Sequence, residues 1–233
     1  MIHFDCRVLD SFLVSDCSRS LALLSNSELA DLSARDYRHD LRKAQFVHSR
    51  LALKRLFSSA LNIDSKRIVI DSSLKRAPLV LVDDVALQSC SVSISHDRNL
   101  VLVAIAFGFQ CGVDIQSWQG IDWSGVVSFM GWSVPFSRSF ELLTSAYPSF
   151  LISPDIFSAM IWSAYEAWMK MTCCLLPSSK FAWQSFDYLA GPSGMFSSFF
   201  EMIVNSEDPD TSARVIIGLS CSEVIAVAYK HVI

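Results

Sequence analysis

The chain has 233 residues, enough for one large domain or two small ones, and carries a net charge of −4. Hydrophobic residues make up 52% of it and the mean hydropathy is +0.36, but the longest stretches without a charged side chain, Asn99–Val113 and Trp123–Ser137, are too short to cross a bilayer core of about 30 Å. The N-terminal residues do not show the pattern of a secretory signal, so we expect a soluble cytoplasmic protein without a membrane segment.

Charge is distributed unevenly along the chain. Residues 1–110 carry 14 Lys and Arg against 12 Asp and Glu, whereas residues 111–233 carry 5 against 11. Eleven basic side chains lie within Arg35–Arg76, which favours a phosphorylated ligand there, although a solvent-exposed helix face would carry the same charges. The acidic second half favours a metal ion or a basic surface. Nucleic acid is disfavoured because the chain is acidic overall and its basic block lacks interleaved aromatic residues.

Ser25–Ala60 is predicted to be helical. Apolar residues at spacings of 3, 4 and 7 define one face, formed by Phe46, Leu53, Leu56, Phe57 and Ala60. Arg50 lies at the edge of this face, so we expect it to point partly inward and to require an anionic partner. Arg55 is expected to point the opposite way, into solvent.

Short β-rich segments follow the helical region. We expect strands at Arg67–Asp71, Pro78–Asp83, Cys90–Ser95, Leu100–Phe107 and Gly112–Ile115, with a hairpin turn at residues 97–99. The segment Ser117–Pro154 has no clear period but is rich in aromatic residues. Further strands are expected near the end of the sequence, at Arg214–Leu219 and Val224–Tyr229.

A helix after residue 153 is well marked. Ser153 is a candidate N-cap, Pro154 takes the first helical position, Asp155 complements the helix dipole and Pro177 marks the end. The apolar stripe expected to face the core comprises Ile161, Ala164, Trp168, Met171 and Leu175.

The order of helix then strands, repeated once, predicts an α+β fold. We expect two similar α+β halves, residues 1–110 and 111–233, each a small antiparallel sheet packed with helices. No direct sequence repeat relates the halves, so they would match in shape alone.

Two strand segments contain candidate functional residues. The strand end Ser93–His96 offers hydroxyl, backbone N–H and imidazole groups to a phosphate, although a strand-end histidine in solvent would look the same. In Gly112–Gln116, alternation places Asp114 and Gln116 on one face, where two oxygen ligands suit a hard cation such as Mg²⁺. An ordinary surface strand would share this second pattern.

The third candidate segment is Trp162–Lys170 on the well-marked helix. Glu166 and Lys170 lie four residues apart and therefore share a helix face. A plain surface ion pair is the alternative interpretation. The helix is otherwise nearly uncharged from Ile156 to Leu175, which predicts burial on most sides and favours a functional reason for retaining the two charges.

Taken in order, these segments resemble the signature of the Sfp-type phosphopantetheinyl transferases. That signature has a Ser-x-Ser-His strand end, then Gly-[Val/Ile]-Asp-[Ile/Val]-Glu, then Trp-[Ser/Thr]-x-Lys-Glu-[Ala/Ser]-x-x-Lys, and the three segments follow the same order at similar spacing. Upstream, Phe46–Leu53 resembles the family's arginine-containing helix and Leu74–Pro78 its Gly-Lys-Pro-like loop. The resemblance covers the chain from about Arg35 to Pro177.

Two positions depart from the family's pattern. Gln116 replaces the glutamate that ends the second motif, which removes a negative charge but leaves a carbonyl oxygen for Mg²⁺, directly or through water. Tyr165 replaces the lysine before the motif glutamate. It flanks the Glu166 face, so we expect a change in packing or phosphate contact and no loss of catalysis.

The resemblance implies a reaction in which a carrier-protein serine attacks the β-phosphorus of coenzyme A and 3′,5′-ADP leaves. It implies that Asp114 and Glu166, with Gln116 as a weaker or water-mediated ligand, hold Mg²⁺, that Glu166 takes the serine proton and that Lys170 neutralises phosphoryl oxygens. The residues implied to bind the 3′-phosphate and nucleotide end are Arg50, Lys75 or Arg76, Ser95 and His96. The halves would be related by a pseudo-twofold axis, with the active site in the cleft between them.

The implied partner is an acyl or peptidyl carrier protein, and we expect a monomer because two halves supply the whole cleft. The aromatic segment Trp118–Phe150 offers an apolar docking surface, unless its side chains mostly build the core of the second half. Two other interpretations stay open. One is a relative that binds coenzyme A or a carrier protein without transfer, supported by Gln116 and Tyr165. The other is an unrelated α+β nucleotide-binding protein, although no Walker loop or Gly-x-Gly-x-x-Gly is present.

Overall fold

The computed structural model describes residues 1–9, 18–35, 39–72, 77–173, 181–189, 196, 198–205 and 212–231. Within these residues the chain is a mixed α+β protein with three sheets whose paired strands run antiparallel, which confirms the predicted fold class. It divides into two compact units, Met1–Val113 with His231–Ile233, and Asp114–Lys230. None of the described helices is long and apolar enough to cross a membrane.

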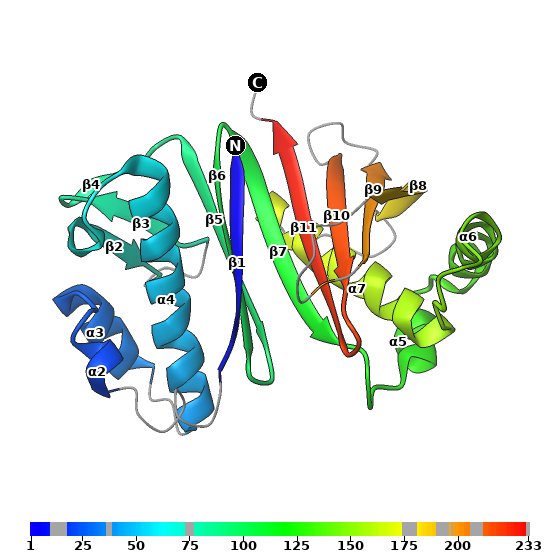
Figure 1. Ribbon diagram of the computed structural model, residues 1–233, viewed down its shortest axis with the longest axis horizontal. Coiled ribbons are helices and arrows are strands. Elements are labelled where there is room, and N and C mark those ends of the chain that lie inside the picture. The colour runs from blue at the N-terminus through cyan, green and yellow to red at the C-terminus, as the bar shows by residue number, and fades with distance from the viewer. Residues whose placement is uncertain are drawn as a thin grey trace. The chain divides into compact units, whose positions relative to one another are not determined.

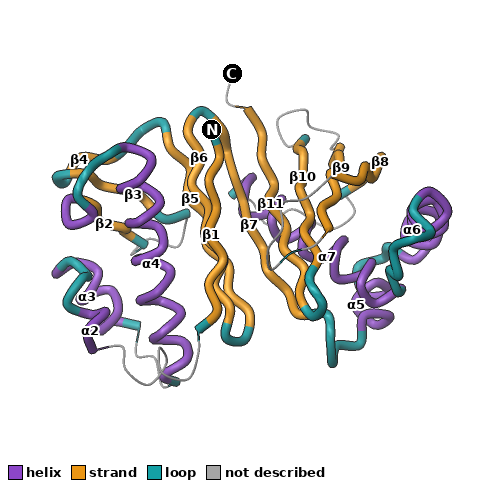
Figure 2. Tube along the Cα trace, viewed as in Figure 1, coloured by secondary structure: helices purple, strands orange, loops and turns teal. Residues whose placement is uncertain are grey.

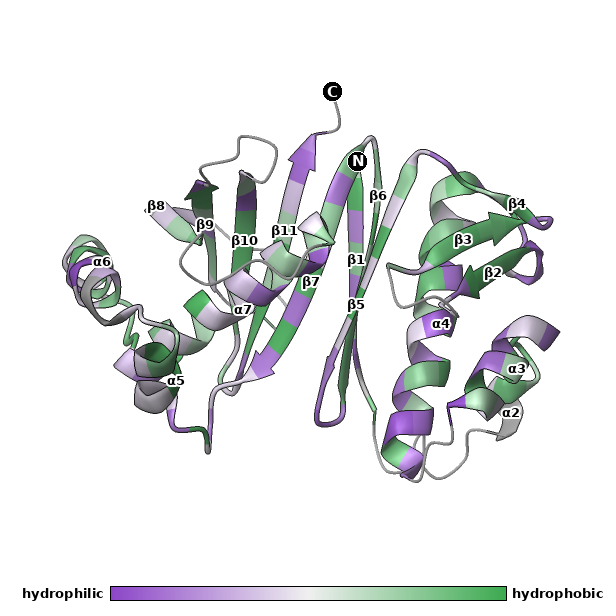
Figure 3. Cartoon of the chain, turned by 180° about the vertical axis from the view of Figure 1, so that it is seen from behind, coloured by the Kyte–Doolittle hydropathy of each residue, from purple (hydrophilic) through white to green (hydrophobic). Residues whose placement is uncertain are grey.

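The first unit contains two of the sheets. One has the order β1-β6-β5, formed by β1 (Ile2–Val8), β6 (Leu100–Phe107) and β5 (Cys90–Asp97), and the other consists of β2 (Ile68–Asp71), β3 (Leu79–Val82) and β4 (Val85–Ala86). The central strand β6 is almost wholly buried because β1 and β5 flank it and the long helix α4 (Asp40–Leu61) packs on it. Figure 1 shows α4 alongside this sheet, and Figure 3 shows the apolar strand β3 in green.

The helical region predicted at Ser25–Ala60 forms two helices, whereas the sequence pattern gave no sign of a break between them. It forms α3 (Asn26–Ala34) and α4, while residues 36–38 lie outside the described part of the chain. A short helix α2 (Ser18–Leu21) precedes them and a 3₁₀ turn η1 (Ser65–Arg67) follows. The interruption lets α3 contact β2 while α4 covers β6. Most of the predicted apolar face is confirmed, because Phe46, Leu53 and Phe57 are buried and Arg55 is exposed.

A buried ion pair joins α3, α4 and β2. Glu28 closes a capping box with Ser25 and also contacts Lys54 Nζ at 2.6 Å. The same carboxylate accepts a hydrogen bond from the backbone N–H of Ile70 at 3.1 Å, and Lys54 donates to the carbonyl of Leu23 at 3.3 Å. Both charged side chains are less than 5% exposed, at 1% and 4%, so each charge depends on the other inside the unit.

The second unit is built on the five-stranded sheet β7-β11-β10-β9-β8. Its strands are β7 (Phe109–Ser117), β8 (Ala182–Leu189), β9 (Ser198–Asn205), β10 (Ala213–Leu219) and β11 (Glu223–His231). The first residues of β7 belong to the first unit, and from Asp114 onward the strand belongs to the second. Helix α7 (Pro154–Thr172) packs on β10, as Figure 2 lets the reader follow.

Two helices that were not predicted lie within Ser117–Pro154. They are α5 (Trp123–Phe129) and α6 (Ser133–Ala146). Both contact α7. Glycine and proline residues interrupt the apolar period of this segment, so its helices depend on packing more than on local propensity. Trp123 and Trp132 are buried in the core and most other aromatics pack against it, whereas Phe129 is 89% exposed.

Predicted strands are confirmed where the apolar pattern is strong. The segments predicted from sequence correspond to β2, β3, β5, β6, β7, β10 and β11, and the β5–β6 hairpin turns at residues 98–99 with Arg98 at a φ of 47°. Strands β1, β4, β8 and β9 were missed. Strand β1 alternates apolar and polar residues from Ile2 to Val8, so its sequence did carry the signal of a strand. Strand β4 has only two residues, and β8 and β9 lack a regular alternation, so pairing with a neighbouring strand determines their conformation.

The two units share one connectivity. In each, the first strand (β1 or β7) pairs with the last (β6 or β11), and the last also pairs with the strand before it (β5 or β10). In each, a long helix (α4 or α7) follows the first strand in sequence and packs on a strand of that sheet. The two units are alike in the order in which their strands are connected. No direct sequence repeat accompanies this similarity.

We expect Glu28→Ala to lower the free energy of unfolding by roughly 3–5 kcal/mol, since it leaves the Lys54 ammonium buried without its carboxylate. Urea denaturation would measure this loss. The exposed pair between Arg67 and Asp83 provides the control, and Arg67→Ala should cause no measurable change. Equal stability of wild type and Glu28→Ala would contradict the structural role given to this pair.

Candidate functional site

Helix α7 carries the candidate catalytic side chains, and local rules explain where it begins and ends. The Ser153 hydroxyl accepts a hydrogen bond from the N–H of Ile156 at 3.3 Å and Pro154 opens the helix, as predicted. The helix ends earlier than Pro177, at Thr172, because Cys173 adopts a left-handed conformation with a φ of 53°. The predicted core residues Ile161, Ala164, Trp168 and Met171 are buried, and Leu175 lies outside the described residues.

Both charges of the Trp162–Lys170 segment lie on the one partly open face of α7. Glu166 and Lys170 are half-buried, as are Trp162 and Met169, while the remaining positions between Phe157 and Met171 are buried. Figure 3 shows that most of α7 is apolar or of intermediate hydropathy (green and pale), with hydrophilic residues (purple) in between. This face is where two ionisable groups retain access to solvent.

Strand β7 brings Asp114 to this face of the helix. The Asp114 side chain is 3% exposed, and its Oδ1 accepts a hydrogen bond from Lys170 Nζ at 2.8 Å. The same Nζ lies 3.8 Å from Glu166 Oε2. Three predicted site residues, one from β7 and two from α7, therefore come together within the second unit.

The Glu166 carboxyl has a raised pKa, at about 7. The main cause is burial, and the negative charge of Asp114 and a hydrogen bond with its carboxyl act in the same direction. Lys170 opposes the shift, since its positive charge favours the ionised form. Glu166 is therefore a carboxyl whose protonation changes near neutral pH, as a general base requires.

The site residues fit a divalent cation. Mg²⁺ is commonly held by one or two carboxylates together with substrate phosphates and water. Asp114 and Glu166 supply two carboxylates from different elements, and their mutual repulsion shows that the pair favours positive charge. In the described part of the chain no group of three or more His, Cys, Asp and Glu residues is placed to hold a metal.

Gln116, the third predicted ligand, is half-buried on the same strand. Its Nε2 donates a hydrogen bond to the carbonyl of the adjacent Ser117 at 3.2 Å. Tyr165, the other departure from the family pattern, lies in the aromatic core with its ring 5.3 Å from those of Trp132 and Phe181. Burial and the charge of Glu166 raise the pKa of its phenol, so it remains neutral. Tyr165 thus has a packing role.

Arg50 is buried in the first unit, and its predicted anionic partner is Asp31 of α3. The guanidinium stacks on the Phe46 ring at 3.5 Å, lies 3.9 Å from Asp31 Oδ2 and donates to the Ser72 hydroxyl. Arg35 also binds Asp31, at 2.8 Å. The inward position of Arg50 therefore needs no ligand, and its predicted contact with coenzyme A stays a prediction. Asp31 lies outside the motifs, so no sequence signal marked it.

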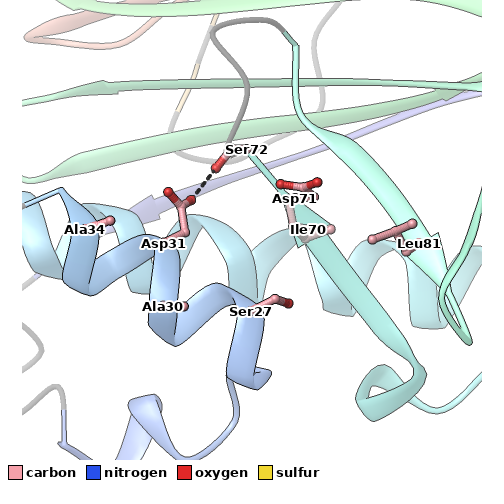
Figure 4. Close-up of a pocket in the computed structure, with 8 residues that line it drawn as sticks. All are labelled: Ser27, Ala30, Asp31, Ala34, Ile70, Asp71, Ser72 and Leu81. Carbon is pink, nitrogen blue, oxygen red and sulfur yellow. Dashed lines mark hydrogen bonds between the residues drawn. The ribbon is translucent and has the colours of Figure 1, made fainter.

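A pocket of about 480 Å³ lies between α3 and β2, beside this network. It is lined by Ser27, Ala30, Asp31, Ala34, Ile70, Asp71, Ser72 and Leu81. Figure 4 shows the hydrogen bond from the Ser72 hydroxyl to Asp31, which measures 2.9 Å. The two carboxylates in the lining disfavour a phosphate, so this pocket does not match the nucleotide site implied by the resemblance.

The Ser93–His96 segment has a mixed role in the first unit. Ser93 Oγ accepts the backbone N–H of Val113 at 3.0 Å, so this serine supports β7. Ser95 is buried and His96 is exposed. Arg42 Nη1 lies 2.9 Å from His96 Nδ1, and because arginine only donates, the imidazole nitrogen accepts. Arg42 was not predicted, although it belongs to the basic block Arg35–Arg76.

Lys75 and Arg76, the predicted loop contacts to coenzyme A, lie outside the described residues.

Comparison of the chain with protein-family models and with curated proteins finds no match.

We expect the raised pKa of Glu166 to make stability fall as pH rises from about 4.5 to about 7 in metal-free buffer. In this window the unfolded chain has lost the Glu166 proton while the folded protein retains it, so folding becomes less favourable with increasing pH. Glu166→Gln cannot ionise. Urea midpoints measured from pH 4 to 8 should therefore fall in wild type relative to Glu166→Gln, and parallel profiles would contradict the shift.

Proposed function

We propose that this chain is a Mg²⁺-dependent phosphopantetheinyl transferase that moves the 4′-phosphopantetheine arm of coenzyme A onto a carrier-protein serine. The observation that carries the proposal is that Asp114, Glu166 and Lys170, which belong to two motifs of the resemblance, lie close together. The Lys170 ammonium is 2.8 Å from Asp114 Oδ1 and 3.8 Å from Glu166 Oε2. Helix spacing alone explains why Glu166 lies near Lys170, so the contact between Asp114 and Lys170 is what tertiary structure adds in support.

Glu166 acts as the base in the proposed reaction. It takes the proton of the carrier serine hydroxyl as the serine oxygen bonds to the β-phosphorus of coenzyme A. The bond from that phosphorus to the oxygen bridging the two phosphates breaks, and 3′,5′-ADP leaves with the electron pair. In the metal-free protein the pKa of Glu166 is about 7, so its carboxylate is partly ionised at neutral pH. A divalent cation bound beside it would lower this pKa and favour the ionised form that takes the proton.

Lys170 and Asp114 provide the electrostatic support. Lys170 is one helical turn from Glu166, and its flexible side chain can neutralise charge that develops on phosphoryl oxygens. Asp114, held rigidly in β7, and Glu166 would hold Mg²⁺, with Gln116 as a weaker or water-mediated ligand. The bound cation would supply Lewis-acid neutralisation of the pyrophosphate.

The nucleotide end of coenzyme A is assigned to first-unit residues. We include Arg50, Ser95, His96 and Lys75 or Arg76, and the pairing of Arg42 with His96 adds a cation beside the predicted imidazole. The proposal also includes two similar halves, and the strand connectivity that the two units share supports this likeness.

The proposed partner is an acyl or peptidyl carrier protein in the cytoplasm, and the proposed enzyme is a monomer. Most aromatics of Trp118–Phe150 build the core, so the candidate docking residues are the exposed apolar ones, Phe129 and Leu142.

The second candidate function is a non-catalytic binder of coenzyme A or a carrier. Gln116 and Tyr165, which replace the glutamate and the lysine of the family's motifs, are the residues that favour this alternative.

We expect an apo carrier protein incubated with this chain, coenzyme A and Mg²⁺ to gain the mass of one phosphopantetheine group, with the gain abolished by EDTA. Asp114→Asn and Glu166→Gln should lower the transfer rate by roughly 10²–10³-fold, because each removes charge from the reacting centre. Intact-protein mass spectrometry measures both results.

Asp187→Asn is the matched control for these variants, since it removes one carboxylate from an exposed position on β8. Normal transfer by both Asp114→Asn and Glu166→Gln would exclude the proposed site. Coenzyme A binding without 3′,5′-ADP release, across carriers of several classes, would favour the non-catalytic binder.

We expect Gln116→Glu to retain transfer and to lower the Mg²⁺ concentration needed for half-maximal rate, because a third carboxylate strengthens attraction for the cation. A Mg²⁺ titration of the transfer rate in both proteins measures the change. Complete loss of transfer would argue against a ligand role for this position.

A further inference from the structure

The Lys170 ammonium lies between two carboxylates of the second unit. Its Nζ is 2.8 Å from Asp114 Oδ1 and 3.8 Å from Glu166 Oε2. The Asp114 side chain is 3% exposed, so its negative charge is largely removed from water. A buried carboxylate requires a nearby cation, and Lys170 supplies one.

The three side chains differ in how far each can move. Asp114 is short and is held in the buried strand β7, whereas Lys170 has a long flexible stem on the partly open face of α7 and is 33% exposed. The ammonium can therefore leave the carboxylates for solvent without moving the backbone. Asp114 has no comparable freedom.

The charges also favour exchange. Once Glu166 is ionised, the two carboxylates and one ammonium sum to −1, which still attracts a cation. A divalent cation on the same carboxylates brings the sum to +1 and places two positive groups close together. That arrangement drives the lysine outward and suits a ligand with several phosphate oxygens.

We propose that Lys170 is an exchangeable internal cation. In the metal-free protein its ammonium neutralises Asp114 and Glu166, and a divalent ion that binds these carboxylates displaces it. Lys170 becomes available to phosphate oxygens once the metal is bound, which imposes an order of metal before phosphorylated substrate. The inference rests on the proposed function for the location of the metal ligands, but it concerns the resting state of the site.

The first test follows the lysine in the unaltered protein. Lysines are acylated with a small amine-reactive reagent, with and without Mn²⁺, and the modification of each is measured by peptide mass spectrometry. Lys66 of η1 is exposed and serves as the internal reference. Labelling of Lys170 relative to Lys66 should rise several-fold with Mn²⁺, because the displaced amine is no longer held against the two carboxylates and is more accessible to the reagent.

The second test measures metal affinity directly. Lys170→Gln should bind Mn²⁺ about tenfold more tightly than wild type by electron paramagnetic resonance, since a unit charge a few Å from the metal has been removed. Lys66→Gln, which also removes one lysine charge, should bind Mn²⁺ as wild type does. The labelling experiment needs no variant and remains decisive if Lys170→Gln fails to fold.

Unchanged or reduced Lys170 labelling with Mn²⁺ bound would overturn the inference, as would equal Mn²⁺ affinity of wild type and Lys170→Gln, or no binding by either. These outcomes are separate from those of the transfer assay. Carrier modification with unchanged labelling would leave the transferase standing and reject the exchange. Release of Lys170 by Mn²⁺ without carrier modification would support the exchange and reject the transferase.

Discussion

A carboxylate buried in a protein interior needs a cation beside it, and this requirement organises the second unit. Asp114 enters the core on β7, and the ammonium of Lys170 meets it at 2.8 Å from α7. The contact constrains how the last turn of α7 lies against β7. Helices α5 and α6 pack on α7 in turn, and their aromatic side chains form much of the core around it. The candidate site is thus also a point on which the packing of the unit depends.

The first unit uses buried charge in the same way. Glu28 and Lys54 neutralise each other among α3, α4 and β2, and Arg50 lies against Asp31. Part of the basic block that suggested a phosphorylated ligand is therefore engaged inside the unit. Counting charges along the sequence overstates the number of cations offered to a ligand, because it does not distinguish an internal partner from an external one.

The chemistry of the site follows from three charges in a partly buried place. Burial and the neighbouring carboxylate raise the pKa of Glu166 toward neutrality, while the ammonium of Lys170 limits the rise. The same proximity makes the carboxylates attractive to a metal ion and makes the lysine its competitor. The proposed general-base function, metal binding and cation exchange thus all rest on one arrangement, whose members cannot be altered independently.

The sequence by itself determined the features that depend on local chemistry. The cap and first residues of α7, the strands β6, β10 and β11, and the shared helix face of Glu166 and Lys170 all follow from periodicity and capping. Tertiary structure decided the approach of Asp114 to Lys170 across 56 residues, the partners of Arg50 and His96, and the helices α5 and α6. The reason is physical: a cap or a stripe is specified by residues a few positions apart, whereas pairing between distant charges depends on the packing that brings their elements together.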